Sequence, residues 1–233
     1  MMPDTYIELS AVPDPAAHNH LEPFLSRYEG LHILALRDAE IESSRRRIER
    51  DRFEVTLMQS AQRSIRYGSR HGEARFRWFM LEQAAAPEGL VCVVDNQTPE
   101  LVYQREVLEH ENGANALRGV IICADSPEAT LQRFARICGA PDSAITQDEP
   151  QTLQLTNASL TVMTPTSLAA LYPGFDVPAT PSLVGMEIHV ARLDTLIAYL
   201  QAEQMKFIRK NKSTIAAQLS APANGILLFS ENN

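Results

Sequence analysis

The sequence has little cysteine and no long apolar run. Its three cysteines, Cys92, Cys123 and Cys138, lie far apart and form no Cys-x-x-Cys pair, so neither a disulfide framework nor a zinc ribbon is predicted. Each lies in an apolar segment, which is typical of a small buried side chain. No window approaches the roughly 18 consecutive apolar residues that a membrane span needs, and the opening Met-Met-Pro-Asp lacks a basic leader and an apolar run. We therefore expect a cytoplasmic protein without a membrane partner.

An excess of positive charge is also absent. The chain has 21 Lys and Arg against 29 Asp and Glu, a formal net charge of -8. Such a chain repels phosphate backbones, and without a local basic patch we expect no nucleic-acid partner. With 233 residues, 45% of them hydrophobic, the chain has the size and composition of one large or two ordinary globular domains.

One unit recurs along the chain: a short apolar strand, an acidic or polar turn and an amphipathic helix. The copies start near His32, Gly119 and Gly185. Self-similarity at such intervals indicates that one supersecondary unit has been copied, and that each copy needs a neighbour to bury its apolar face.

The middle copy is the clearest. Residues 119–124 predict a buried strand, Ser126-Pro127 a helix start, and Gly139 the end of that helix. Three strands are expected next, which makes the unit βαβββ. The strands predicted after the helix lie near 143–148, 151–156 and 159–164 in this copy, 56–66, 74–82 and 89–95 in the first, and 206–209, 213–219 and 225–229 in the last.

Two further segments belong to the first half. Residues 5–12 alternate apolar and polar side chains, as in a strand, and match the last strand of a further unit whose first strand and helix are missing. The helix expected after Asp38 is rich in arginine and glutamate. We interpret it as a solvated outer face with ion pairs rather than a binding site.

The paired βαβββ pattern resembles the glyoxalase-like proteins of the vicinal oxygen chelate superfamily. The resemblance is carried by Tyr6-Ile-Glu-Leu9, by residues 30–36, by Thr98-Pro-Glu-Leu-Val-Tyr103 and by His110-Glu-Asn-Gly-Ala114. It implies an α+β fold in which tandem units pair into curled mixed sheets, with the first unit truncated. The domains would be residues 1–115 and 116–233.

The resemblance also implies a divalent metal, commonly held by a first-strand His and a fourth-strand carboxylate of each unit. Matched position by position, Glu8 and His32 are the expected ligands, and Glu8 is the expected catalytic residue. The other two places are open: the truncated unit has no first strand to supply a His, and at the remaining position Asp95 or Asn96 is a candidate oxygen ligand for a hard ion. A metal that holds adjacent substrate oxygens would act as a Lewis acid while a carboxylate shuttles a proton. The alternatives are a solvated Glu8 and a hydrogen-bonded core His32.

Two arginines suggest the charge of the ligand. In residues 75–80, Phe76, Trp78 and Met80 alternate with Arg75 and Arg77. If the apolar residues face the helix, the arginines point into the cup and are candidate donors to a carboxylate or phosphate. The alternative is that they meet acidic groups elsewhere.

The second half is expected to lack a metal cup, because Gly119 and Gly185 stand where a first-strand His would lie. Alternation places Glu187 and His189 on one strand face with Gly185, so that a carboxylate–imidazole pair is a candidate site there. An ordinary structural pair is the alternative.

The sequence thus favours a glyoxalase-like protein that binds a small molecule, with an anion as the candidate ligand, as a metal-dependent lyase, isomerase or dioxygenase. A non-catalytic sequestering module and a degenerate structural homologue are the alternatives. A sheet without its leading strand exposes an unpaired edge, which tends to recruit another chain. We therefore expect a homodimer or a rearranged amino-terminal half.

Overall fold

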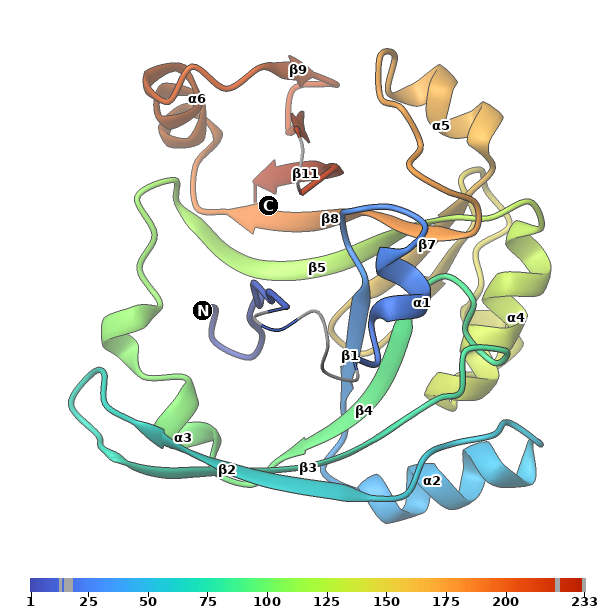
Figure 1. The fold of residues 1–233 in the computed structure, drawn as a ribbon. Coiled ribbons are helices and arrows are strands. Elements are labelled where there is room, and N and C mark those ends of the chain that lie inside the picture. The colour runs from blue at the N-terminus through green and yellow to red at the C-terminus, as the bar shows by residue number, and fades with distance from the viewer. Residues whose placement is uncertain (13, 15–18, 221–222, 232–233) are drawn as a thin grey trace.

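A computed structural model describes residues 1–12, 14, 19–220 and 223–231 (Figure 1). The helices are α1 (Glu22–Leu25), α2 (Ile41–Arg50), α3 (Pro99–Val102), α4 (Pro127–Cys138), α5 (Pro165–Leu171) and α6 (Leu193–Ala202). The strands are β1 (Ile33–Arg37), β2 (Gln59–Ile65), β3 (Gly72–Met80), β4 (Leu90–Asn96), β5 (Ala114–Cys123), β6 (Thr152–Gln154), β7 (Ser159–Met163), β8 (Ser182–Val190), β9 (Phe207–Arg209), β10 (Thr214–Leu219) and β11 (Gly225–Glu231). Among these described residues, no helix is long and apolar enough to cross a membrane.

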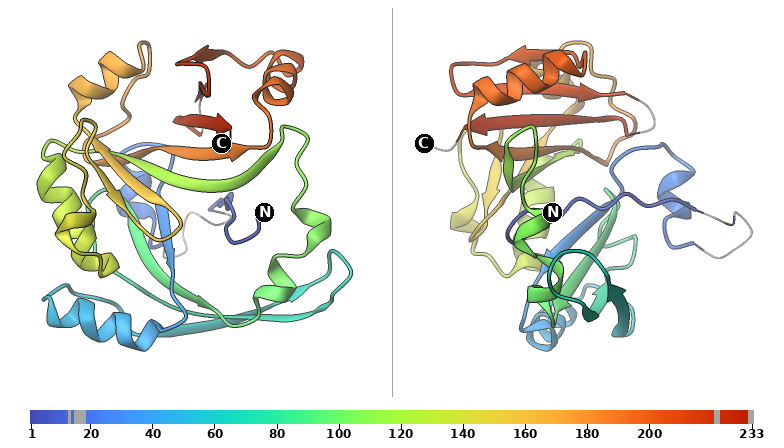
Figure 2. Two further views of the ribbon diagram at one scale, coloured as in Figure 1. Left: turned by 180° about the vertical axis from the view of Figure 1, so that it is seen from behind. Right: turned by 90° about the vertical axis from the view of Figure 1, so that its left-hand side faces the viewer.

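The strands form two curled mixed sheets, neither of which closes into a barrel (Figures 1 and 2). The first has four strands in the order β1-β4-β3-β2, and the second has seven in the order β6-β7-β5-β8-β11-β10-β9. The first strand of each repeated unit runs parallel to the last strand of the same unit, as β1 does with β4, β5 with β7 and β8 with β11. The predicted α+β fold with tandem βαβββ units is confirmed.

Two predicted strands are wrong. Residues 143–148 instead contain a short 3-10 helix, Asp142–Ala144, and a single bridge from Ile145 to Leu153. Residues 5–12 form no strand. An alternating pattern produces a strand only where a neighbouring strand supplies hydrogen bonds, and the described residues place none beside this segment.

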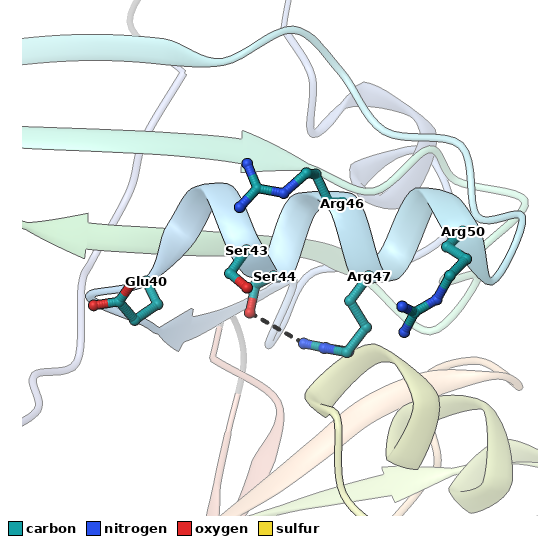
Figure 3. Close-up of a pocket in the computed structure, with 6 residues that line it drawn as sticks. All are labelled: Glu40, Ser43, Ser44, Arg46, Arg47 and Arg50. Atoms are coloured by element: carbon teal, nitrogen blue, oxygen red, sulfur yellow. Dashed lines mark hydrogen bonds between the residues drawn. The ribbon is translucent and has the colours of Figure 1, made fainter.

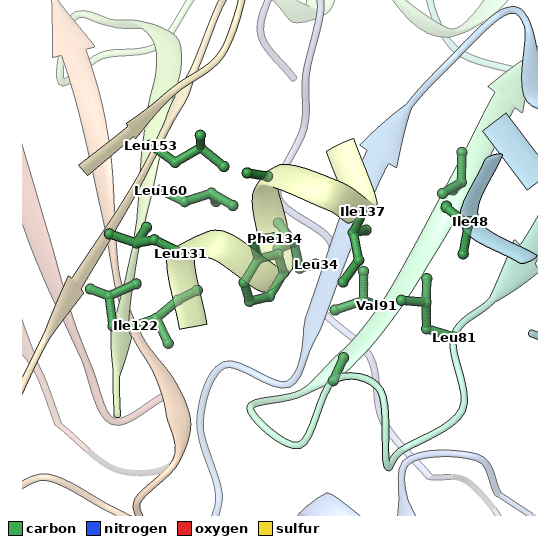
Figure 4. Packing of buried hydrophobic residues seen from close by; sticks show 14 of the residues in the cluster. Leu34, Ile48, Leu81, Val91, Ile122, Leu131, Phe134, Ile137, Leu153 and Leu160 are labelled. Atoms are coloured by element: carbon green, nitrogen blue, oxygen red, sulfur yellow. The ribbon is translucent and has the colours of Figure 1, made fainter. Parts of the chain in front are cut away.

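Helices α2 and α4 join the two sheets in one core. Figure 4 shows Phe134 and Ile137 of α4 between side chains of the first sheet, such as Leu34 and Val91, and side chains of the second sheet, such as Leu160. Phe134 is completely buried. Residues 1–115 and 116–233 therefore share this core, although the four-stranded sheet lies wholly in the first range.

The seven-stranded sheet is covered on both faces. On its helical face, Ile122 belongs to the cluster that contains α4 side chains, and Ile188 belongs to the cluster that contains α6 side chains. The opposite face packs against α5 and the residues after it, with Tyr172 and Phe175 in contact with a cluster that includes Ile121. We call this opposite face the α5 face. The alternation of strand side chains explains the division, because neighbouring residues such as Ile121 and Ile122 belong to different clusters.

The amino-terminal segment, residues 1–9, lies between the two sheets (Figures 1 and 2). Met2 is buried in the α6 cluster, while Met1 packs beside Val102 at the four-stranded sheet. His110 pairs through Nε2 with the main-chain oxygen of Met1, and Oδ1 of Asn112 accepts a hydrogen bond from the nitrogen of Ala114. Both residues of the His110 motif thus make local structural contacts.

Candidate functional site

The four-stranded sheet has a face turned away from α2. Phe79 and Val93 are paired in register and buried on the α2 side. Their neighbours therefore project to the other side, which we call the inner face. By the same register the inner face carries Ala35, Arg37, Arg63, Phe76, Trp78, Met80, Cys92, Val94 and Asn96. The amino-terminal segment lies over it.

Two tyrosines and two arginines meet at the inner face. The rings of Tyr6 and Tyr103 lie 6.4 Å apart between centroids. Arg63 lies close enough to lower the pKa of Tyr6, and Arg37 does the same for Tyr103. The guanidinium of Arg63 also lies 5.7 Å from the centre of the Phe76 ring. The tyrosine pair is thus flanked by two exposed guanidinium groups.

Burial dominates the titration of this region. It raises the pKa of both Tyr6 and Tyr103, and the approach of the Glu8 carboxylate raises that of Tyr6 further. Burial, with a smaller contribution from Glu8, also raises the pKa of the Cys92 thiol to about 12. The tyrosines are therefore hydrogen-bond donors at neutral pH, and Cys92 is a thiol rather than a nucleophilic thiolate.

The predicted orientation of Arg75 and Arg77 is wrong. Arg77 forms an ion pair with Glu42 of α2, and β3 pairing puts Trp78 beside Val94 on the inner face. Arg75 shares the side of Arg77 by alternation. The reason is that Phe79 buries more completely against α2 than Trp78 does against the inner face. The alternative interpretation, in which these arginines meet acidic groups elsewhere, is correct for Arg77.

His32 is a buried histidine beside an aromatic ring. Its side chain is 8% exposed, and its ring centroid lies 4.5 Å from that of Tyr28. Neither ring nitrogen has a hydrogen-bond partner in the structure. Burial lowers the pKa of His32, and Arg27 lowers it further, against a smaller opposing effect of the Tyr28 main chain and Glu29. Alternation along β1 places the ring on the side of Leu34, which packs in the α2 core.

Glu8 lies elsewhere. Its carboxylate is exposed and acts on Tyr6 and Cys92 at the inner face. No interaction among the described residues joins it to His32, and in the same part of the chain no three His, Cys, Asp or Glu side chains lie together in a way that suits a metal ion. As placed, the two predicted ligands, Glu8 and His32, do not fit a metal centre.

The α5 face of the seven-stranded sheet holds the predicted pair of Glu187 and His189. Both side chains lie on the same side of β8, and the charge of His189 lowers the pKa of Glu187. Ser159 and Thr161 of β7 donate hydrogen bonds to the Glu187 carboxylate. The structure thus brings four polar groups together in the second half.

A hollow of about 490 Å³ lies on the outside of the molecule along α2 (Figure 3). Its lining consists of Glu40, Ser43, Ser44, Arg46, Arg47 and Arg50. Arg47 donates to the main-chain oxygens of Arg136 and Ile137 at the end of α4, and Arg45 pairs with Glu49. These contacts agree with the predicted solvated face with ion pairs.

Residues 1–138 match the family model of a glyoxalase-like domain. The chain belongs to the glyoxalase-like domain family. The match includes the whole four-stranded sheet and the first strand and helix of the next unit, and the fold is that of the vicinal oxygen chelate superfamily. The comparison with curated proteins gives no match.

Several solved structures are similar to this glyoxalase-like protein at low sequence identity. A hypothetical protein from Staphylococcus aureus has a TM-score of 0.53 and 9% identity, over 85% of this chain and 65% of that chain. Homoprotocatechuate 2,3-dioxygenase from Arthrobacter globiformis has a TM-score of 0.46 and 10% identity, over 88% of this chain and 62% of that chain. Methylmalonyl-CoA epimerase from Mycobacterium tuberculosis has a TM-score of 0.38 and 11% identity, over 55% of this chain and 94% of that chain. This chain thus spans less than two thirds of the first two proteins.

Arg37 and Arg63 at the inner face of this glyoxalase-like protein are not among the site residues predicted from the sequence. The signal for Arg37 was present, because it alternates with Leu34 and Leu36, which are the apolar residues of its strand. Arg63 had no such signal. Strand β2 is almost entirely polar, so that its two faces cannot be distinguished by hydrophobicity.

Proposed function

We propose that the inner face of the four-stranded sheet binds a small anionic molecule, with Arg37 and Arg63 as its charged donors. The observation that carries this proposal is that Arg37 and Arg63 share the inner face by register, where Arg63 acts on Tyr6 and Arg37 acts on Tyr103 of one tyrosine pair. A guanidinium presents several N–H groups in one plane, which matches the geometry of a carboxylate or phosphate.

The surroundings of the arginines support binding. Phe76, Trp78 and Val94 are half-buried apolar neighbours on the same face, and an apolar wall strengthens a charge-assisted hydrogen bond. The carboxylates of Asp4 and Glu8 also act on this region. The amino-terminal segment thus brings negative charge to the face that carries the two arginines.

Binding without catalysis is the function that the geometry supports best. A metal-dependent lyase, isomerase or dioxygenase requires ligands that converge, whereas Glu8 and His32 have separate neighbours. Elemental analysis of protein purified without chelator distinguishes the two. Stoichiometric metal that is lost in both Glu8→Ala and His32→Ala would favour the enzyme over the binding module.

The single tryptophan offers a direct measurement, because Trp78 lies on the inner face. We expect malonate to change its fluorescence in a saturable way and the neutral analogue malonamide to leave it unchanged. Arg37→Gln and Arg63→Gln each remove a charged donor worth about 1.5–3 kcal/mol, which weakens binding roughly 10- to 100-fold.

Arg75→Gln is the matched control, because Arg75 is an exposed arginine on the opposite side of the same sheet. It should bind malonate as the native protein does. Equal affinity in Arg37→Gln, Arg63→Gln and the native protein would show that the inner face is not the site.

A further inference from the structure

The α5 face of the seven-stranded sheet holds a carboxylate that is only partly satisfied. Oε2 of Glu187 lies 3.3 Å from Oγ of Ser159, and Oε1 lies 3.4 Å from Oγ1 of Thr161. These two hydrogen bonds are long. A carboxylate offers about four acceptor positions, so that Glu187 retains capacity for further donors.

The backbone is shaped around this carboxylate. A Cβ atom at Gly119 of β5 would lie 2.6 Å from Oε2 of Glu187 and 2.7 Å from Oγ of Ser159. Any other residue at position 119 would therefore displace the acid or the hydroxyl. Gly119 lets the Glu187 side chain lie flat across the neighbouring strand.

The same face holds a second polar group, the imidazole of His189, that can make a further hydrogen bond. Among the described residues, the buried Nδ1 of His189 has no hydrogen-bond partner. Buried polar groups normally have partners, and an exception calls for an explanation such as an absent ligand. Tyr172, which follows α5, lies close enough to Glu187 for the carboxylate to raise the pKa of the phenol.

Glu187 lacks a strong cationic partner. Among the described residues it forms no ion pair with Lys or Arg, and His189 is the one charged group that lowers its pKa. Burial raises the pKa of Glu187, against the smaller effects of Ser159, Thr161 and His189. Lys210 lies 4.9 Å from the Tyr172 ring and donates to the main-chain oxygen of Leu171, so that its charge is held at the end of α5.

We propose that the α5 face of the seven-stranded sheet is a second binding site, for a small organic cation such as a protonated amine or amidine, with Glu187 as its counter-ion. An ammonium group brings three donors and one positive charge. It supplies the donors and the positive charge that the Glu187 carboxylate lacks, and Nδ1 of His189 is a further polar atom on the same face. The proposal does not depend on the inner face of the other sheet.

The test is calorimetric titration of the full chain with propylamine and acetamidine at pH 7.5, with propanol as the neutral analogue. The native protein should bind both cations and not propanol. Glu187→Gln keeps the shape of the side chain and should weaken binding at least about tenfold. Glu203→Gln, at an exposed position at the end of α6, should bind as the native protein does.

A second variant keeps the proposal testable if Glu187→Gln folds poorly. Ser159→Ala removes a donor that favours the charged carboxylate, so that the pH midpoint of amine binding should move upward. A purely structural hydrogen bond would not move this midpoint. Propanol binding as tightly as propylamine, no saturable binding by the native protein, or unchanged binding in Glu187→Gln would each overturn the proposal. Arg37→Gln should leave amine binding unchanged, which separates this site from the inner face.

Discussion

At the scale of single residues, His32 shows how burial decides the charge of a side chain. Its imidazole lies against Tyr28 with both nitrogens unpartnered. A positive charge there would lose its hydration and be repelled by Arg27, and the Tyr28 main chain and Glu29 compensate only in part. The folded protein therefore holds His32 in its neutral form.

The stability of the protein should consequently fall in mild acid. The folded-state pKa of His32 lies below its unfolded value of about 6.5. Its contribution is fully present above pH 6.5 and is lost as the pH falls toward the folded-state pKa, because the unfolded chain takes up the proton first. Urea unfolding between pH 5 and 7.5 should show a weaker pH dependence for His32→Gln than for the native protein.

His71→Gln is the control for this measurement, since His71 is exposed. Its pH dependence should equal that of the native protein. The same pH dependence in His32→Gln as in the native chain would mean that folding does not shift the pKa of His32.

At the scale of elements, the loop between β3 and β4 is tied to α4 by an ion pair. Glu88 is 1% exposed and pairs with Arg133, whose side chain is 21% exposed. The pair spans the two halves of the chain, because Glu88 belongs to the four-stranded sheet's unit and α4 covers the seven-stranded sheet. One oxygen of Glu88 and the Nε of Arg133 have no partner in the structure.

Glu88→Gln should lower the free energy of unfolding by about 3 kcal/mol, because it leaves the charge of Arg133 without compensation in a largely buried place. Urea unfolding measures this. Asp194→Asn breaks an ion pair on the surface, in which the side chain of Arg192 is 71% exposed and that of Asp194 is 82% exposed. This variant should change the free energy of unfolding by less than about 1 kcal/mol. Equal effects of the two variants would contradict the account.

The elements also show where sequence patterns lose information. The helix from Pro127 to Cys138 was predictable, because its apolar spacing, its proline start and Gly139 at its end all agree, and Gly139 has the positive φ of 72° that favours glycine. The orientation of β3 was not. Residues 76–80 carry a large apolar side chain on each face, Trp78 on one and Phe79 on the other, because α2 covers one face and the amino-terminal segment the other.

At the scale of the whole molecule, the four-stranded sheet has an open side at β1. Among the described residues, β1 pairs with β4 along its length, and beyond its other side lies only the bridge from Leu31 to Leu183. The main chain of His32 and Asp38 bonds to the β4 side, so that by alternation the N–H groups of Ile33, Ala35 and Arg37 point to the open side. Ile33 exposes 43% of its surface.

The homodimer therefore stays a prediction, and the open side of β1 is the edge at which we expect the two chains to pair. Light scattering should give twice the chain mass, and Ala35→Pro should give the chain mass, because it removes an outward N–H without removing a bond to β4. The circular dichroism spectrum of Ala35→Pro should match that of the native protein. A native protein that remains monomeric at high concentration would contradict the prediction.

How much of the site was predictable differs between the two halves. The shared strand face of Glu187 and His189 was predicted from alternation alone, since β8 pairs with β11 in continuous register around them. The cluster at the inner face was not, because it brings together Tyr6, Arg63 and Tyr103 from segments far apart in the chain. Their proximity depends on the path of residues 1–9 between the sheets, which no local pattern specifies.

The central claim, that the inner face binds a small anion, is tested most directly by a crystal structure of the protein with malonate. We expect the malonate anion to lie beside Trp78 and to accept hydrogen bonds from Arg37 or Arg63. Malonate held instead by the arginines of α2, or by Arg75 on the opposite side of the sheet, would contradict it.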